Sequence, residues 1–248
     1  MNKLPDTIKS IIDDLNDLKE PVLASAVETL CMSREFHDLD SIELIEQLLL
    51  PVCEKKLDKR FQGRIEKAHL SGCPQAIDTC KDSSERLYLP NGIVNTLSTL
   101  SFIDEGLNIC ILGPSDSGKS YLAKALAVMA CVKHMVCYEH CENFLEAMVS
   151  LKNLDYQKYQ KKVRHYIKLD LLVLDDFLLH TITDEREIKV LFEIMEKRNE
   201  LSRSTIVCSQ RDPNSWPAMI LNDEVSANSI MKRATKHYTV VIQPKNNQ

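Results

Sequence analysis

Eight consecutive residues hold the side chains best suited to bind phosphate. They fit the pattern G-x-x-x-x-G-K-S without a mismatch: Gly113, Pro114, Ser115, Asp116, Ser117, Gly118, Lys119 and Ser120. Glycines let backbone N–H groups turn toward phosphate oxygens, and the positive end of a following helix points at the same place. Lys119 supplies a flexible charge for the β- and γ-phosphates, and the Ser120 hydroxyl can ligate Mg²⁺. The motif predicts a site for ATP with Mg²⁺.

The setting of this loop supports the prediction. An apolar run typical of a buried strand, residues 109–112, precedes it, and a stretch with a helical apolar stripe begins at Ser120. A strand that leads through the loop into a helix is the context the motif requires. The alternative, a plain glycine turn, does not account for this context.

A second candidate element is an apolar run that ends in two acids, residues 171–176. Asp175 is placed to hold Mg²⁺ through water, and Asp176 to orient or deprotonate an attacking water molecule. The alternative is an ordinary strand end with solvated acids. Because the run follows a matching phosphate loop, we favour the functional interpretation.

The elements that would position these residues change character along the chain. Apolar residues recur at helical spacing through residues 1–70. One of the predicted helices starts at a capping box of Asp40 and Glu43 and ends at Leu50, and the next begins at Pro51. Turn-forming residues dominate 71–92, which we interpret as a linker. Beyond it, strand-like runs alternate with helical stripes: 108–112, 135–138, 169–174, 204–209 and 238–242.

This alternation predicts an α/β fold with a parallel sheet flanked by helices. The predicted organisation is a helical N-terminal module over 1–70, a linker over 71–92, an ATPase domain over 93–244 and a tail over 245–248.

Composition narrows the class of protein. The chain has 248 residues, 44% of them hydrophobic and 27% charged, and a net charge of −5, which argues against a surface built throughout to coat nucleic acid. No signal peptide and no apolar run of about 18 residues is present, so we expect a cytoplasmic protein without membrane contact. Nine cysteines include the group Cys131, Cys137 and Cys141 with His134 and His140, but its spacing matches no standard zinc pattern and we do not expect a metal there.

Taken in order, the phosphate loop, residues 169–176, the run 204–210 and the segment from Trp216 to Arg233 resemble the AAA+ helper ATPases of insertion-sequence transposition, the IstB family. Residues 54–69 are similar to the charged helix that precedes the ATPase core in that family. The DnaC-type helicase loaders are related to it. The resemblance covers about residues 50 to 242.

The resemblance implies a P-loop NTPase core of the AAA+ type without a C-terminal helical lid, assembly of identical subunits on double-stranded DNA, and recruitment of a transposase. Asp175 matches the family's Mg²⁺ aspartate. Asp176 stands where the family often has glutamate, and Gln210 where an asparagine commonly senses the γ-phosphate, so both put the hydrolysis rate in doubt. Arg233 matches the arginine expected to reach a neighbouring subunit's nucleotide, with Arg198 as the fallback.

Two basic segments are candidates for DNA contact, although charge runs are often only solvated faces. Residues 54–69 carry six cations (Lys55, Lys56, Lys59, Arg60, Arg64 and Lys67), and residues 152–168 carry another six (Lys152, Lys158, Lys161, Lys162, Arg164 and Lys168) interleaved with three tyrosines. Contacts of this kind go to phosphates and give affinity without sequence specificity.

Four functions fit the motifs to different degrees. The leading one is a DNA-binding ATPase that activates a transposase, and the second is a helicase loader. A third is an interaction scaffold that binds ATP with little hydrolysis, suggested by Asp176 and Gln210. A small-molecule P-loop kinase ranks last, because no arginine-rich lid is evident between Asp176 and Ser204.

Overall fold

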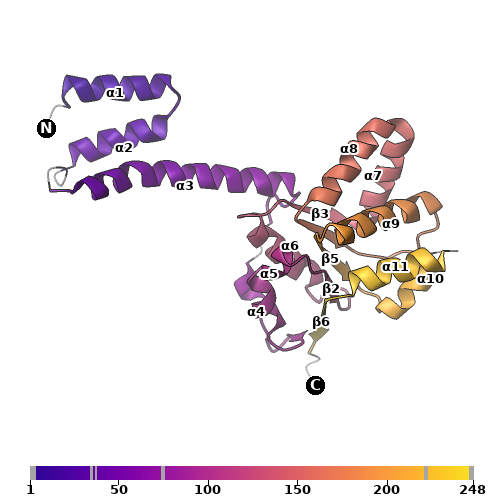
Figure 1. Ribbon diagram of the computed structural model, residues 1–248. Coiled ribbons are helices and arrows are strands. Elements are labelled where there is room, and N and C mark those ends of the chain that lie inside the picture. The colour runs from indigo at the N-terminus through magenta and orange to yellow at the C-terminus, as the bar shows by residue number, and fades with distance from the viewer. Residues whose placement is uncertain (1–3, 34–35, 37, 74–75, 221–222, 246–248) are drawn as a thin grey trace. The chain divides into compact units, whose positions relative to one another are not determined.

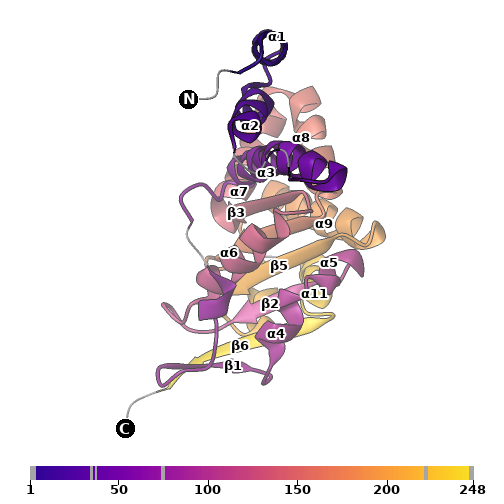
Figure 2. The ribbon, with the colours of Figure 1, turned by 90° about the vertical axis from the view of Figure 1, so that its left-hand side faces the viewer.

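The computed structural model of the protein describes residues 4–33, 36, 38–73, 76–220 and 223–245. The chain forms two compact units, Met1–Gly63 and Arg64–Gln248. Figures 1 and 2 show the elements of each unit from two directions.

The N-terminal unit is helical, as the sequence predicts. Helix α1 (Asp6–Asp17) packs against α2 (Pro21–Met32), and α3 (Ser41–Lys67) begins in this unit and continues into the second. The predicted capping box is present at the start of α3: the Asp40 N–H donates to Glu43 Oε2 (3.0 Å), and the Glu43 N–H donates to Asp40 Oδ1 (2.9 Å).

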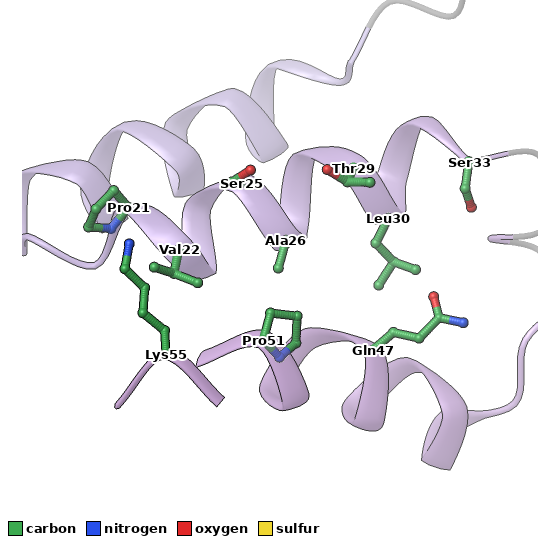
Figure 3. A pocket seen from close by; sticks show the side chains of 10 residues that line it. All are labelled: Pro21, Val22, Ser25, Ala26, Thr29, Leu30, Ser33, Gln47, Pro51 and Lys55. Atoms are coloured by element: carbon green, nitrogen blue, oxygen red, sulfur yellow. The ribbon is translucent and has the colours of Figure 1, made fainter. Parts of the chain in front are cut away.

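Pro51 does not divide this helix. The sequence predicts one helix ending at Leu50 and another beginning at Pro51, whereas α3 is continuous with Pro51 inside it. A proline removes one intrahelical hydrogen bond, but helix-forming residues on both sides can carry the helix through it. Pro51 lines a groove of about 520 Å³ together with Val22, Ala26 and Leu30 of α2. Figure 3 shows the Pro51 ring and the Leu30 side chain pointing into the space between the two helices.

Six strands form one sheet in the second unit, in the order β1–β6–β2–β5–β4–β3. Strands β2 to β6 are parallel, and β1 is antiparallel to β6 at one edge. Their bounds are β1 (Arg86–Leu89), β2 (Ile109–Leu112), β3 (Val136–His140), β4 (Leu171–Asp175), β5 (Ser204–Ser209) and β6 (Tyr238–Pro244). The five predicted strands are all present as a parallel set, which brings their carboxyl ends to the same edge.

Helices cover both faces of this sheet. They are α4 (Ile93–Ser98), α5 (Ser101–Asp104), α6 (Lys119–Ala130), α7 (Cys141–Leu154), α8 (Tyr156–Lys168), α9 (Glu185–Glu200), α10 (Trp216–Met219) and α11 (Glu224–Ala234), with short 3₁₀ turns η1 (Ile77–Thr79) and η2 (Pro213–Ser215). Helices α7 to α11 share one core with Cys110, Leu172, Leu174 and Val207 of the sheet. Helix α6 packs across β2 to β5, and Figure 1 shows it on the side of the strands away from α9.

The segment predicted as a linker, residues 71–92, is part of the sheet unit. It contains η1 and β1, whose register pairs Arg86 with Pro244 and Leu89 with Val241. A strand of four residues between turn-forming residues is too short to show alternation. The boundary between units also lies before the predicted position at residue 70, because Ala68 and Leu70 are fully buried and the Tyr138 N–H donates to the Ala68 carbonyl (2.9 Å).

Candidate nucleotide-binding site

The phosphate loop joins the end of β2 to the start of α6, at the carboxyl edge of the parallel strands. A Cβ added at Gly113 would lie 2.6 Å from Ser117 Oγ and 2.7 Å from the Ile242 carbonyl oxygen. Gly118 has a φ of 99° at the first position before α6. Gly113 is therefore required for close packing and Gly118 for a left-handed turn.

Two features of this loop fit a bound phosphate. Among the described residues, Ser117 Oγ is buried without a hydrogen-bond partner, so it can donate to an added oxygen atom. The first N–H groups of α6 have no carbonyl partner within their own helix, and they form the positive end that attracts anions. The residues present therefore fit the phosphates of ATP.

Lys119 is held inside the loop. It is 5% exposed, and its Nζ donates to the Pro114 carbonyl (2.6 Å). Burial lowers the pKa of the ammonium group, while the nearby carboxylates of Asp175 and Asp176 oppose this shift. A phosphate in the loop would also oppose it, so phosphate binding and the charge on Lys119 favour each other.

The predicted Mg²⁺ ligand, Asp175, ends β4 and is 1% exposed. The Tyr138 hydroxyl of β3 donates to its Oδ2, and the Asp176 N–H donates to its Oδ1 (3.0 Å). Burial and this bond to Asp175 raise the pKa of Tyr138 far above its ordinary value, so Tyr138 remains a donor. Asp175 has the charge, and Ser120 the hydroxyl, that Mg²⁺ prefers among protein ligands.

The predicted catalytic acid, Asp176, lies on the turn after β4 with a φ of 52°. This left-handed conformation suits aspartate better than most residues. Its carboxylate Oδ2 is 3.4 Å from Nδ1 of His140, and its side chain is 39% exposed. His140 ends β3, in register with Asp175, so strand pairing brings this histidine to the site.

One cleft of about 470 Å³ brings the phosphate loop together with two other predicted residues. It is lined by Asp176, by Gln210 directly after β5, and by five residues of the loop: Ser115, Asp116, Gly118, Lys119 and Ser120. The ends of β4 and β5 are tied together, because the Phe177 N–H donates to the Cys208 carbonyl (2.7 Å) and Ser209 Oγ donates to the Phe177 carbonyl (2.8 Å). These bonds hold Asp176 and Gln210 on one side of the loop.

Four residues that the sequence does not assign to the nucleotide site also lie at or beside the cleft. They are Tyr138, His140, Tyr121 and Arg86. Tyr121 lines the cleft, and its hydroxyl is 2.7 Å from Thr79 Oγ1. The guanidinium of Arg86 on β1 occupies the space beside Gly118, where an added Cβ would lie 2.7 Å from its Nη1. A polar residue on a short strand carries no sequence signal for this placement, and only the pairing of β1 with β6 reveals it.

Arg233 lies at the opposite edge of the sheet. Asn108 precedes β2, at the amino ends of the parallel strands, and its Nδ2 donates to the Arg233 carbonyl (2.9 Å). The Arg233 guanidinium is 3.0 Å from Glu196 Oε1 of α9 and lies over the Phe192 ring. Arg233 does not line the cleft of its own subunit among the described residues. Its predicted role can therefore apply only to the site of another subunit.

Arg198, the fallback for that role, is a buried structural residue. It is 1% exposed, and its guanidinium donates to the carbonyls of Tyr166 (2.6 Å) and Leu169 (2.9 Å) and to Thr205 Oγ1 (3.0 Å). Burial lowers its pKa to about 9. A cation that already satisfies these groups cannot reach a neighbouring nucleotide, so the fallback assignment is wrong.

Both basic segments keep most of their cations exposed. On α8, Lys158, Lys161, Arg164 and Lys168 are exposed, while Tyr159 and Tyr166 are buried in the core. On α3, five cations are exposed (Lys55, Lys56, Lys59, Arg60 and Lys67), and Arg64 Nη1 donates to the Cys131 carbonyl (3.2 Å). Within the described ranges, no helix is both long and apolar enough to cross a membrane.

Comparison with known proteins shows which proteins this chain is similar to. The family model described as IstB-like ATP binding protein matches residues 13–248. A protein named as ATP-binding in insertion sequence IS232 of Bacillus thuringiensis subsp. berliner is 32% identical over 147 residues, which is 58% of this chain and 56% of that protein. A protein of Sinorhizobium fredii (strain NBRC 101917 / NGR234), named as an insertion-sequence ATP-binding protein, is 30% identical over 214 residues, 85% of this chain and 84% of that protein.

Among solved structures, the crystal structure of the DnaC helicase loader is similar over 68% of this chain and 97% of that chain, with a TM-score of 0.52 and 20% identity. At this identity the likeness concerns the fold alone. The predicted fold class is confirmed: a mostly parallel sheet flanked by helices, of the P-loop AAA+ type, with helices preceding it.

Proposed function

The chain belongs to the family of IstB-like ATP binding proteins, and we propose that it is a DNA-stimulated ATPase that assembles on double-stranded DNA and activates a partner transposase. The observation that carries the proposal is the single cleft in which the phosphate loop meets Asp176 and Gln210. Relatives named for insertion sequences support transposition as the process in which the ATP is used.

In this proposal the residues of the cleft divide the work of hydrolysis. Lys119 and the N–H groups of the loop hold the phosphates, and Ser120 and Asp175 hold Mg²⁺, which neutralises phosphate charge when bound. Asp176 orients the attacking water and accepts its proton, and His140, 3.4 Å away, orients the Asp176 carboxylate. Gln210 reaches toward the γ-phosphate from the end of β5.

The exposed cations of α8 are the proposed contact with DNA. They lie on the face opposite the buried Tyr159 and Tyr166, and Asp155 is the only acid in the stretch from Lys152 to Lys168. Lysine and arginine side chains on one helix face contact phosphates of any sequence. Binding of this kind gives strong dependence on salt and little dependence on sequence.

The test measures ATP turnover with and without double-stranded DNA, using Lys119→Ala as the inactive control. We expect DNA to raise turnover of the wild-type chain and not of the variant. Tight ATP binding with no turnover under either condition would favour a scaffold and overturn the ATPase assignment.

The proposed role in transposition is tested with the transposase encoded by the same insertion sequence. The proposal requires that transposase binds the chain only when ATP and DNA are both present. Binding to a replicative helicase instead would favour the helicase-loader alternative and overturn the transposition assignment.

A further inference from the structure

Three side chains far apart in the sequence place metal-binding atoms around one point at the edge strand β3. Cys137 and Glu139 lie two residues apart on β3 and so point to the same face. His69 lies just beyond α3. The Cys137 Sγ is 3.8 Å from His69 Nδ1 and 3.4 Å from Glu139 Oε1, and His69 Nδ1 is 3.2 Å from the same oxygen. All three residues belong to the sheet unit.

The size of this triangle fits a tetrahedral cation. Zinc binds sulfur at about 2.3 Å, and nitrogen and oxygen at about 2.0–2.2 Å. Tetrahedral angles then separate sulfur from nitrogen or oxygen by about 3.6 Å, and nitrogen from oxygen by about 3.4 Å. The three separations in the cluster, 3.8, 3.4 and 3.2 Å, each differ from these by about 0.2 Å. An ion could occupy the site with little movement of the side chains.

In this cluster, one carboxylate oxygen lies close to more hydrogen-bond donors than it can accept. The Tyr166 hydroxyl donates to Glu139 Oε1 (2.6 Å), and Cys137 Sγ and His69 Nδ1 also approach that oxygen. A carboxylate oxygen offers about two lone-pair sites, fewer than three donors need. A cation would take the place of the Cys137 and His69 protons and leave the Tyr166 bond intact. Tyr166 would then be the kind of outer partner that orients a metal-binding carboxylate.

The backbone around the cluster holds the three residues in place. The Tyr138 N–H donates to the Ala68 carbonyl (2.9 Å), which fixes the residue before His69 against β3. Cys137 is 2% exposed, whereas the His69 side chain is 51% exposed. The enclosed thiol and the exposed imidazole place the cluster at the surface of the sheet unit, where water can supply a fourth ligand.

We propose that His69, Cys137 and Glu139 bind one zinc-type divalent cation, with water as the fourth ligand. A thiolate with an imidazole and a carboxylate favours Zn²⁺ over Mg²⁺, which prefers oxygen ligands. The site is distinct from the nucleotide cleft, because Tyr138 and His140 on the other face of β3 contact Asp175 and Asp176. The sequence predicts no metal at Cys137 because the cysteines and histidines near it in the chain match no zinc spacing, and His69 lies far from them in the sequence.

The test uses the full chain, stripped of metal by a chelator and titrated with Co²⁺. We expect one Co²⁺ per chain, with the visible spectrum of a tetrahedral site, a thiolate-to-metal charge-transfer band, and displacement by Zn²⁺. Zn²⁺ should also raise the unfolding temperature of the wild-type chain, because it binds the folded state. Absence of stoichiometric binding, or a spectrum without thiolate, would overturn the proposal.

Matched variants separate this site from other thiols. Cys137→Ser should lose the charge-transfer band, whereas Cys53→Ser, at an exposed cysteine, and Cys131→Ser, at a buried one, should keep it. His69→Asn is a second ligand variant that should fold, because asparagine tolerates the left-handed φ of 60° at this exposed position. Tyr166→Phe keeps all three ligands and should weaken Zn²⁺ affinity about 10–100-fold. Unchanged affinity in both Cys137→Ser and His69→Asn would show that zinc binds elsewhere.

Discussion

The Tyr138 hydroxyl donates a hydrogen bond to Oδ2 of Asp175, linking β3 to the last residue of β4. The other carboxylate oxygen accepts the Asp176 N–H at 3.0 Å. Both oxygens of a carboxylate that is 1% exposed are therefore held in place before any metal arrives.

Tyr138→Phe should weaken the Mg²⁺-dependent part of ATP binding about 10–100-fold, because an outer partner that orients a metal ligand is lost. ATP affinity in the absence of Mg²⁺ should not change. Calorimetric titrations with and without Mg²⁺ measure both quantities. Tyr156→Phe, at an exposed tyrosine of α8, is the control. Equal Mg²⁺ dependence in Tyr138→Phe and the wild type would contradict a role for this bond.

Lys119→Ala should abolish useful ATP affinity while the fold remains intact. The lysine donates only to a carbonyl of its own loop in the described structure, so its loss removes little beyond the phosphate contact. Calorimetry with Mg²⁺ measures the affinity, and thermal unfolding without nucleotide checks the fold. Lys133→Ala, at an exposed lysine, should bind ATP like the wild type. Wild-type affinity in Lys119→Ala would remove the phosphate loop from the site.

Asp176→Asn should keep ATP binding and reduce turnover about 10²–10⁴-fold, the usual contribution of a general base. Asp176→Glu is the converse test. The longer glutamate side chain should raise turnover. The left-handed φ of 52° at position 176 suits glutamate less well than aspartate, so the variant should be less stable by about 1 kcal/mol. Steady-state turnover and thermal unfolding measure the two effects. Wild-type turnover in Asp176→Asn would move the catalytic role to another acid, such as Glu185 or Glu187.

Charge reversal at Lys158, Lys161 and Arg164 should weaken DNA binding equally for all sequences and lower its salt dependence by about 0.9 in the logarithmic slope for each lost contact. The parallel triple on α3 is Lys55, Lys59 and Arg60, since Arg64 is bound to a carbonyl. Affinities measured over a range of salt concentrations decide between the helices. If neither triple changes affinity, DNA is bound by another surface.

Arg233→Ala should keep ATP affinity and lose the rise of specific turnover with protein concentration that assembly produces. The arginine is expected to stabilise phosphate charge in a neighbouring subunit. Mixing Arg233→Ala with Lys119→Ala should restore activity, because one subunit gives the arginine and the other the intact cleft. Glu196→Ala, which frees Arg233 from its ion pair, is the companion variant and should keep the concentration dependence. A mixture that remains inactive would exclude action between subunits.

The sequence predicted the features that depend on residues close together in the chain. The phosphate loop and the pair Asp175 and Asp176 are contiguous, and their types alone indicate the chemistry. The five parallel strands are visible because burial on both faces makes them apolar. Tyr138 and His140 reach the acids only through the register of β3 on β4. Nothing in a single sequence gives that pairing.

The predictions for Arg198 and for the segment that contains β1 were wrong for the same reason. A charged residue such as Arg198 on a helix is usually exposed. Only the packing of α9 over the sheet shows that its guanidinium donates hydrogen bonds to carbonyls of two other segments. Likewise, β1 gains its place from pairing with β6, more than a hundred residues later in the chain. These are long-range contacts without a local pattern.

The placement of Arg233 and the phosphate loop at opposite edges of the sheet has a consequence for symmetry. A contact between the cleft of one copy and Arg233 of the next, repeated in the same sense from copy to copy, joins two different surfaces head to tail. Such a head-to-tail chain of subunits has a direction. It closes into a ring or grows as a helix with unequal ends, one presenting an incomplete cleft and the other an unused arginine. In such an assembly a Lys119→Ala subunit would lose the site on one of its sides, and an Arg233→Ala subunit the site on its other side.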